Sequence, residues 1–142
     1  MCLSTKTSVY SVAKNDISCY KVLLWCDGEF MTPYQKTFIP IKVREGIIPF
    51  FADGVQSIEK SYCPDGTLSE SYVIGRGFVH TYKSLISACY LKKHLEIIYP
   101  NSVWAIFECE IPKGTKYYEG EDDFYEEAFA SEKIKFVKET EL

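Results

Sequence analysis

The residue best suited to chemistry in this sequence is His80, which follows the glycine-containing stretch 75–79. Imidazole exchanges protons near neutral pH, and a glycine-containing loop lets a ligand approach the backbone closely. A helix is expected to begin directly after His80, and a helix N-terminus favours an anion such as phosphate. Arg76 would add a bidentate partner for that anion. The alternative is a histidine that only hydrogen-bonds to backbone at the start of a helix.

Carboxylates offer a second kind of chemistry because they crowd together late in the chain. Six of them fall within nine positions: Glu119, Glu121, Asp122, Asp123, Glu126 and Glu127. Calcium and magnesium prefer such oxygen ligands, yet the spacing lacks the pattern of an EF-hand loop. Aromatic and alanine side chains at i,i+4 spacing favour a short helix near 122–129 instead. We therefore expect a solvated acidic helix or loop and no metal site.

A thiol nucleophile is the third candidate. Cys63 precedes the turn 64–66 and looks the most exposed of the six cysteines, but it would need a base such as His80 beside it. All six cysteines are predicted to be reduced, because the chain has no C-x-x-C motif, no export signal and enough length for a core. A cytoplasmic location is expected on the same grounds.

Composition predicts one globular domain over residues 1–142, with 46% hydrophobic and 25% charged residues. The net charge is −4, and residues 101–142 hold 11 Asp/Glu against 5 Lys/Arg. No basic stripe is present, which argues against extended nucleic acid as a partner. No apolar run is long enough to cross a bilayer. Phosphate-loop and dinucleotide motifs are missing from the sequence, so no cofactor is predicted.

The elements that position these residues are predicted to be strands and one main helix. Continuous apolar character in Ile17–Trp25 predicts a central strand that is buried on both faces. Pro40 places the strand Thr37–Val43 at a sheet edge. The helix is expected from Thr81, as its N-cap, to Tyr99, because Pro100 follows. Further strands are predicted at Val9–Val12, Gly46–Phe51, Leu68–Ile74, Val103–Ile111 and Ser131–Lys138.

The predicted helix has two apolar arcs, so it is expected to be covered on both sides, while His94 faces solvent. The first arc holds Tyr82, Leu85, Ile86, Cys89 and Tyr90, and the second holds Ala88, Leu91 and Leu95.

The strand Val103–Ile111 alternates, which predicts that Trp104, Ile106, Glu108 and Glu110 face away from the core. If it pairs antiparallel with the last strand, the two glutamates lie near Lys133 and Lys135. The result is an α+β fold, a mostly antiparallel twisted sheet packed on one main helix at about 81–99.

Short motifs resemble a group of small uncharacterised proteins from gut Bacteroidales and their phages. They are Cys19-Tyr20-Lys21-Val22, Thr32-Pro33-Tyr34, Gly77-Phe78-Val79-His80, and the stretches 111–120 and 130–134. The resemblance spans nearly the whole chain and implies a compact cytosolic domain, with a phage as one source. No activity or catalytic residue comes with it. Tyr20-Lys21 in an early strand is also similar to ADP-ribosyltransferase-like folds, although their Ser-Thr-Ser strand is missing.

Three functions follow. The surplus of tyrosine favours a non-enzymatic binding or accessory protein whose ligand is a small molecule or a protein. Its binding residues would be Tyr20, Tyr34, Arg76, His80, Lys113 and Tyr117. The first alternative is a nucleotide-handling enzyme with an ADP-ribosyltransferase-like fold, in which Tyr20, Arg76, His80 and Glu132 share one cleft. The second is a structural protein, such as part of a virion, that forms a homo-oligomer.

Overall fold

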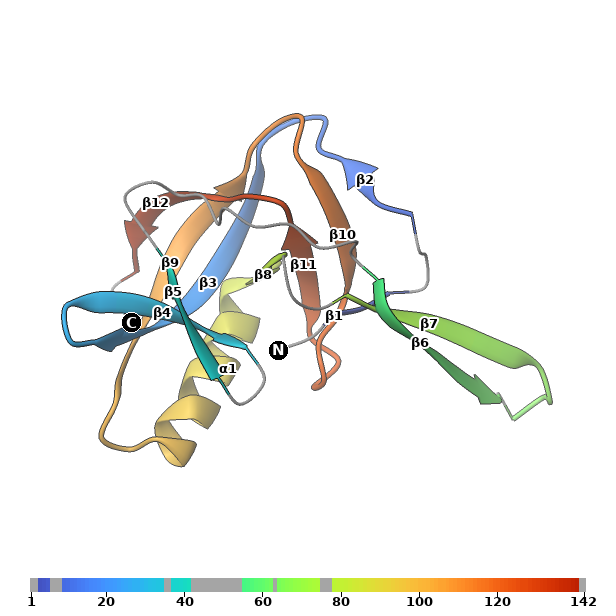
Figure 1. Ribbon diagram of the computed structural model, residues 1–142, viewed down its shortest axis with the longest axis horizontal. Coiled ribbons are helices and arrows are strands. Elements are labelled where there is room, and N and C mark those ends of the chain that lie inside the picture. The colour runs from blue at the N-terminus through green and yellow to red at the C-terminus, as the bar shows by residue number, and fades with distance from the viewer. Residues whose placement is uncertain are drawn as a thin grey trace.

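The computed structural model describes residues 3–5, 9–34, 37–41, 55–62, 64–74 and 78–140. In this part of the chain one helix and a curved sheet are formed (Figure 1). The strands are β1 Leu3–Thr5, β2 Ser11–Val12, β3 Ile17–Cys26, β4 Glu29–Tyr34, β5 Thr37–Ile41, β6 Val55–Tyr62, β7 Leu68–Ile74, β8 Val79–Tyr82, β9 Val103–Ile111, β10 Lys116–Glu121, β11 Glu127–Ser131 and β12 Lys135–Glu139, and the helix is α1 Leu85–Ile98.

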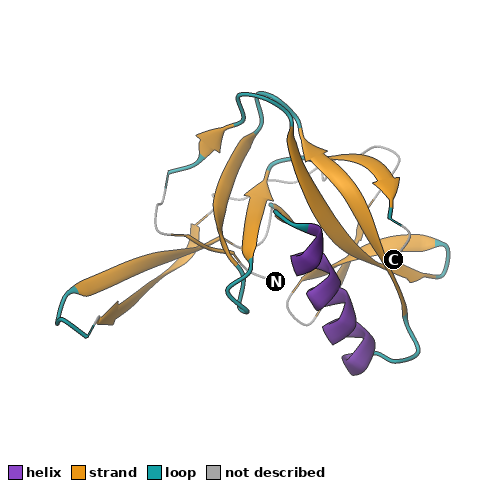
Figure 2. Ribbon diagram, turned by 180° about the vertical axis from the view of Figure 1, so that it is seen from behind, coloured by secondary structure: helices purple, strands orange, loops and turns teal. Residues whose placement is uncertain are grey.

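The strands form one sheet in the order β12-β9-β3-β8-β11-β10-β1-β7-β6. Strand β4 branches from β3 and carries β5, and β2 pairs with β10. All of these pairings are antiparallel. The helix lies against one face of the sheet, over β3, β8 and β9, whereas the β6–β7 hairpin projects from the body (Figure 2). The predicted α+β class, with its antiparallel sheet on one helix, is confirmed.

Strand β3 is the central strand that its apolar run predicted. It pairs with β9 along its length, from Ile17↔Ile111 to Trp25↔Val103. Successive side chains point to opposite faces, so Val22 and Leu24 pack toward α1 while Cys19 and Leu23 join a second buried cluster on the other face. The prediction that Trp104 and Ile106 face away from the core is wrong, because both are buried beneath α1.

The helix begins later than its apolar pattern predicted. Ser84 is the N-cap, and its hydroxyl accepts from the backbone N–H of Ser87. Thr81, the expected cap, belongs to β8 and lies opposite Phe129 of β11. Of the two expected arcs, the one with Ala88, Leu91 and Leu95 is buried. The other is divided: Tyr82 is buried in β8, Leu85 and Cys89 pack partly against the core, and Ile86 and Tyr90 are 66% and 58% exposed. Burial of the whole of this other arc is therefore wrong.

The short acidic helix expected near 122–129 is also wrong. Strand β10 ends at Glu121, a turn follows, and β11 begins at Glu127. The backbone N–H of Asp122 donates to the carbonyl of Glu126, and Tyr125 takes a left-handed φ of 62° that a helix would not contain. The i,i+4 aromatic and alanine spacing reflects instead a strand whose residues Ala128, Phe129 and Ala130 are buried.

The remaining predicted strands agree in part. Strand β7 matches its predicted bounds, and β5 is a sheet edge that pairs with β4, as Pro40 indicated. Strand β2 covers only the end of the predicted Val9–Val12, and Gly46–Phe51 lies outside the described residues.

Strand β12 pairs antiparallel with β9, which is the arrangement on which the expected contacts between glutamates and lysines depended. Lys135 lies opposite Glu110. A register shift after Phe136 brings Lys138, rather than Lys133, within 3.7 Å of Glu108.

Gly120 provides a test of the β1–β10 contact. A Cβ at this position would overlap the carbonyl of Ser4 in β1. We expect Gly120→Ala to lower the free energy of unfolding by more than about 2 kcal/mol, because backbone must move to relieve the overlap. Chemical denaturation measures this. Gly114→Ala is the control: Gly114 has φ of 86° but open space around it, so about 1–2 kcal/mol is expected. Equal losses for the two variants would contradict the contact.

Candidate functional site

His80 lies in strand β8 and not in the loop where it was predicted. It is buried, with ring Nδ1 3.1 Å from the carbonyl of Phe78 and Nε2 3.1 Å from that of Ile74. Burial, and then the charge of Lys21, lowers the pKa of His80 from 6.5 to about 3. A neutral ring has one N–H, so only one of the two carbonyls can accept from it. The geometry is that of a structural histidine.

Lys21 is a buried cation that sequence reasoning overlooked. It is 3% exposed, in the middle of β3, and its Nζ donates to the carbonyl of His80 at 2.7 Å. Burial lowers the pKa of Lys21 to about 8. Strands β3 and β8 pair at Tyr20↔Tyr82. Two residues before Tyr82 in β8, the backbone carbonyl of His80 accepts its hydrogen bond from the Lys21 side chain. The only sequence signal was a lysine inside an apolar run.

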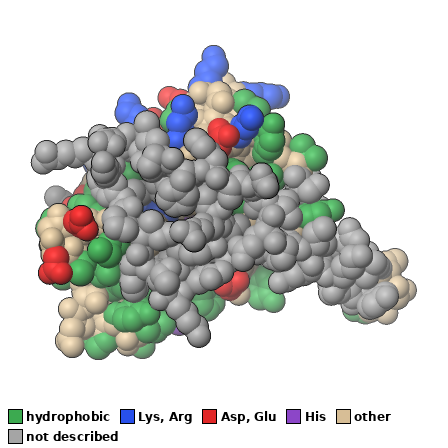
Figure 3. Space-filling model, in the orientation of Figure 1, with side chains coloured by type: hydrophobic (Ala, Val, Ile, Leu, Met, Phe, Trp, Pro, Cys, Tyr) green, Lys and Arg blue, Asp and Glu red, His purple; other side chains and the backbone are tan. Residues whose placement is uncertain are grey.

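The other predicted binding residues do not gather around His80. Tyr20 is half-buried against the helix-side core. Glu132 is half-buried after β11, and its N–H donates to the carbonyl of Lys116. Lys113 is exposed in the turn between β9 and β10. In Figure 3, Lys and Arg side chains gather at the top of the view, the end where Figure 1 shows this turn. Tyr117 packs edge-on against Phe129 in β10 and β11.

Several predicted residues cannot be placed. Tyr34 lies in β4 opposite Thr37, but its side chain is outside the described residues. Arg76 and the proposed nucleophile Cys63 lie outside them altogether.

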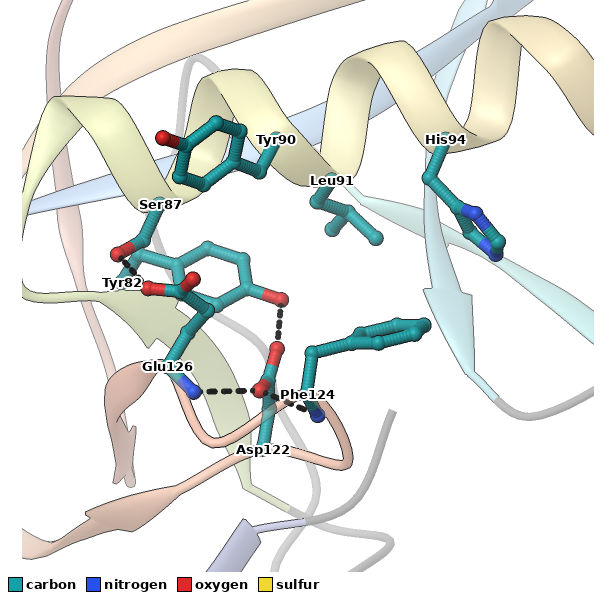
Figure 4. A pocket seen from close by; sticks show the side chains of 8 residues that line it. All are labelled: Tyr82, Ser87, Tyr90, Leu91, His94, Asp122, Phe124 and Glu126. Atoms are coloured by element: carbon teal, nitrogen blue, oxygen red, sulfur yellow. Dashed lines mark hydrogen bonds between the residues drawn. The ribbon is translucent and has the colours of Figure 1, made fainter.

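The described part of the chain instead forms a pocket where α1 passes over the turn between β10 and β11 (Figure 4). Its volume is about 160 Å³. We call it the turn pocket, and it is lined by Tyr82, Ser87, Tyr90, Leu91, His94, Asp122, Phe124 and Glu126. Among the described residues, none of those predicted from the sequence to bind or catalyse is in this lining.

Asp122 holds the turn side of this pocket together. The residue is 6% exposed, and a buried carboxylate is stable only when hydrogen bonds replace its hydration. Its Oδ1 accepts from the backbone N–H groups of Phe124 and Glu126, each at 2.9 Å. Its Oδ2 accepts from the Tyr82 hydroxyl at 2.5 Å. Burial, and then this carboxylate, raises the pKa of Tyr82 far above its ordinary value, so the phenol stays protonated.

A second hydrogen-bond chain ties the start of the helix to the same turn. The Ser84 hydroxyl caps α1, and the Ser87 hydroxyl donates to Oε2 of Glu126 at 2.7 Å. Ser87 is buried and Glu126 half-buried. The polar first turn of α1 therefore positions the glutamate at the pocket.

The other end of the pocket is aromatic. The rings of His94 and Phe124 meet edge-on with centroids 5.1 Å apart, and Phe124 is 56% exposed. His94 is exposed, as predicted, and follows Tyr90 at i,i+4 on the same side of α1. Figure 4 shows Ser87, Tyr82, Tyr90 and Glu126 at one end, with His94 and Phe124 at the other. The pocket thus combines two carboxylates with ring surfaces.

Comparison with protein-family models, curated proteins and solved structures finds no match to this chain. Across the described ranges, no three His, Cys, Asp or Glu side chains are grouped to hold a metal ion. The described part also contains no helix with the length and apolar character to span a membrane. Cys19, Cys26, Cys89 and Cys109, the cysteines it includes, are free thiols.

The depressed pKa of His80 makes stability dependent on pH. Below about 6.5 the unfolded chain gains a proton that the folded chain does not take up until about pH 3. Unfolding is therefore favoured by about 1.4 kcal/mol for each pH unit of acidification in that window. Denaturation of wild type and His80→Gln at several pH values measures this. The variant is expected to lose less stability on acidification, and identical slopes would show that His80 does not titrate this way.

The hydroxyl of Tyr82 is expected to contribute to the stability of the fold, although the residue lies in an apolar core. Tyr82→Phe keeps the ring but removes the hydrogen bond to the Asp122 carboxylate, so we expect a loss of about 1.5–3 kcal/mol in unfolding free energy. Tyr90→Phe, whose side chain is largely exposed, is the matched control and should change stability by less than about 0.5 kcal/mol. Thermal denaturation compares the two. A neutral Tyr82→Phe change would contradict the role given to Asp122.

Proposed function

We propose that this protein is a non-enzymatic binding protein and that its ligand occupies the turn pocket. The observation that carries this proposal is that the pocket is held open by its own hydrogen bonds. Tyr82–Asp122 joins β8 to the turn, and Ser87–Glu126 joins α1 to it. A site whose walls are fixed before binding loses less conformational entropy when the ligand arrives.

The rim of the pocket supplies contact surface of the kind that binding sites use. Tyr90, from α1, and Phe124, from the turn, both line the pocket and are both more than half exposed. Rigid aromatic side chains offer a large contact area at a small entropic cost, which is why they are enriched where proteins bind partners. The exposed surface of these two rings does not contribute to packing in the core, so it is free to contact a ligand.

Binding without catalysis is favoured by the state of the buried polar groups. A catalytic acid or base needs a pKa near the working pH and access to the substrate. His80 is buried and held neutral, and Tyr82 is held protonated. Burial raises the pKa of the Cys19 thiol to about 11 and that of Cys109 further, which keeps both from acting as nucleophiles.

The nucleotide-enzyme alternative gains no support from the pocket, because Tyr20, His80 and Glu132 do not line it. A cytoplasmic accessory role is part of the proposal, and the free thiols of the described cysteines support it.

A fragment screen by ligand-observed NMR tests the proposal on the full chain. We expect binders whose signals weaken by at least about threefold with Phe124→Ala, which removes one pocket wall. Tyr125→Ala is the matched control, since Tyr125 is the next residue, is 84% exposed and does not line the pocket. A library without any Phe124-dependent binder would overturn the proposal.

A further inference from the structure

The charges around the turn pocket are of one sign. Asp122 and Glu126 line it, and the exposed carboxylates of Asp123 and Glu127 flank them in the turn and in β11. No lysine or arginine among the described residues lines the pocket. Of the described lysines next in sequence to its lining residues, Lys93 is exposed and the other two form ion pairs. Lys83 pairs with Glu119 at 3.1 Å, and Lys92 pairs with Glu96 at 3.7 Å.

The carboxylate of Glu126 has capacity for another donor. Its Oε2 accepts from Ser87, and no hydrogen bond to its Oε1 is formed by the described residues. Asp122, in contrast, already accepts from three donors. A ligand that donates hydrogen bonds and carries positive charge would therefore meet Glu126 first, because charge-assisted hydrogen bonds are the stronger ones.

Aromatic rings line the same space. Tyr82 and Tyr90 lie at the Glu126 end, and Phe124 lies at the other (Figure 4). The faces of aromatic rings carry partial negative charge and attract ammonium groups, most strongly where water is excluded. Leu91, which is buried, adds an apolar surface between the two ends.

The volume limits what can enter. The pocket measures about 160 Å³, and an apolar cavity of about 150 Å³ holds one benzene molecule. The largest apolar group that fits inside the pocket is therefore one ring or a short alkyl chain. The rest of a larger ligand would extend past the exposed Phe124.

We infer that the turn pocket binds a small organic amine in its ammonium form, with the cationic group at Glu126 and Tyr90 and a single apolar body toward Phe124 and His94. This inference rests on the proposed function and specifies the chemical class of its ligand. Neither a carboxylate nor a phosphate fits the site, because Asp122 and Glu126 would repel it.

Isothermal titration of the full chain with three probes of one size tests the inference. They are benzylammonium, benzyl alcohol and benzoate, which differ in charge but share the ring. Benzylammonium is expected to bind at least about tenfold more tightly than benzyl alcohol, and benzoate most weakly. This comparison uses wild-type protein, so it does not depend on any variant folding.

Glu126→Gln then tests the assigned position of the ammonium group. It keeps the shape of the side chain and an acceptor for Ser87, and it should bring benzylammonium to within about threefold of benzyl alcohol. Glu127→Gln is the matched control, because Glu127 is exposed and does not line the pocket. This control should keep the preference for the cation.

The outcomes separate this inference from the proposed function. Equal binding of the alcohol, tighter binding of benzoate or no binding of any probe overturns the cation inference. A preference for the ammonium that survives Glu126→Gln overturns the assignment to Glu126. In each of these cases, a fragment of another chemical class whose binding depends on Phe124 would still support the binding function. The proposed binding function itself is overturned only if no fragment binds in a Phe124-dependent way.

Discussion

The carboxylate of Asp122 is the group on which the arrangement around the pocket depends. Buried charge is costly, and here its cost is offset by two backbone N–H groups of the turn and by the Tyr82 hydroxyl. The two backbone bonds determine the shape of the turn, including the left-handed Tyr125 and the outward Phe124. The bond to Tyr82 then joins that turn to a strand 40 residues earlier. One side chain thus sets local backbone shape and tertiary position together.

The position of the turn has consequences for the sheet. With the turn held, β11 pairs with β8 from Ala128↔Tyr82 to Ser131↔Val79. Strand β8 must remain extended through Tyr82 to make these pairs, so α1 cannot begin until Ser84. Because the helix begins there, Ser87 reaches Glu126 and the outer side of α1 leaves Tyr90 and His94 beside the turn. The pocket is a consequence of where the strand stops and the helix begins.

The sequence was a good guide wherever local pattern decides structure. Runs rich in β-branched and aromatic residues predicted β3 and β9 closely, and the bounds expected for β7 were also correct. The antiparallel pairing of β9 with β12, the condition for the expected charge pairs, is formed. The pattern failed where a partner far along the chain decides. Thr81 was expected to cap the helix and Tyr82 to lie on one of its apolar arcs, but pairing with β11 makes both part of a strand. Asp122 was expected among solvated acidic residues, but contact with Tyr82 buries it.

The site was harder to predict than the fold for the same reason. His94, expected to face solvent on the helix, and the aromatic Phe124 among acids were visible signals. Tyr90 was expected to be covered, and only tertiary structure brings all three to one pocket. The glycine-flanked histidine drew attention by residue type, yet its ring nitrogens face backbone carbonyls in a buried strand. Residue type indicates what a side chain could do, and burial decides whether a ligand can reach it.

The most direct measurement of the central claim is a crystal structure of the full chain with benzylammonium bound. The account predicts an ammonium group within hydrogen-bonding distance of Glu126, a ring lying toward Phe124, and an unchanged bond between Tyr82 and Asp122. A ligand found elsewhere on the protein, or a turn that rearranges to admit it, would contradict the claim that the turn pocket is a preformed binding site.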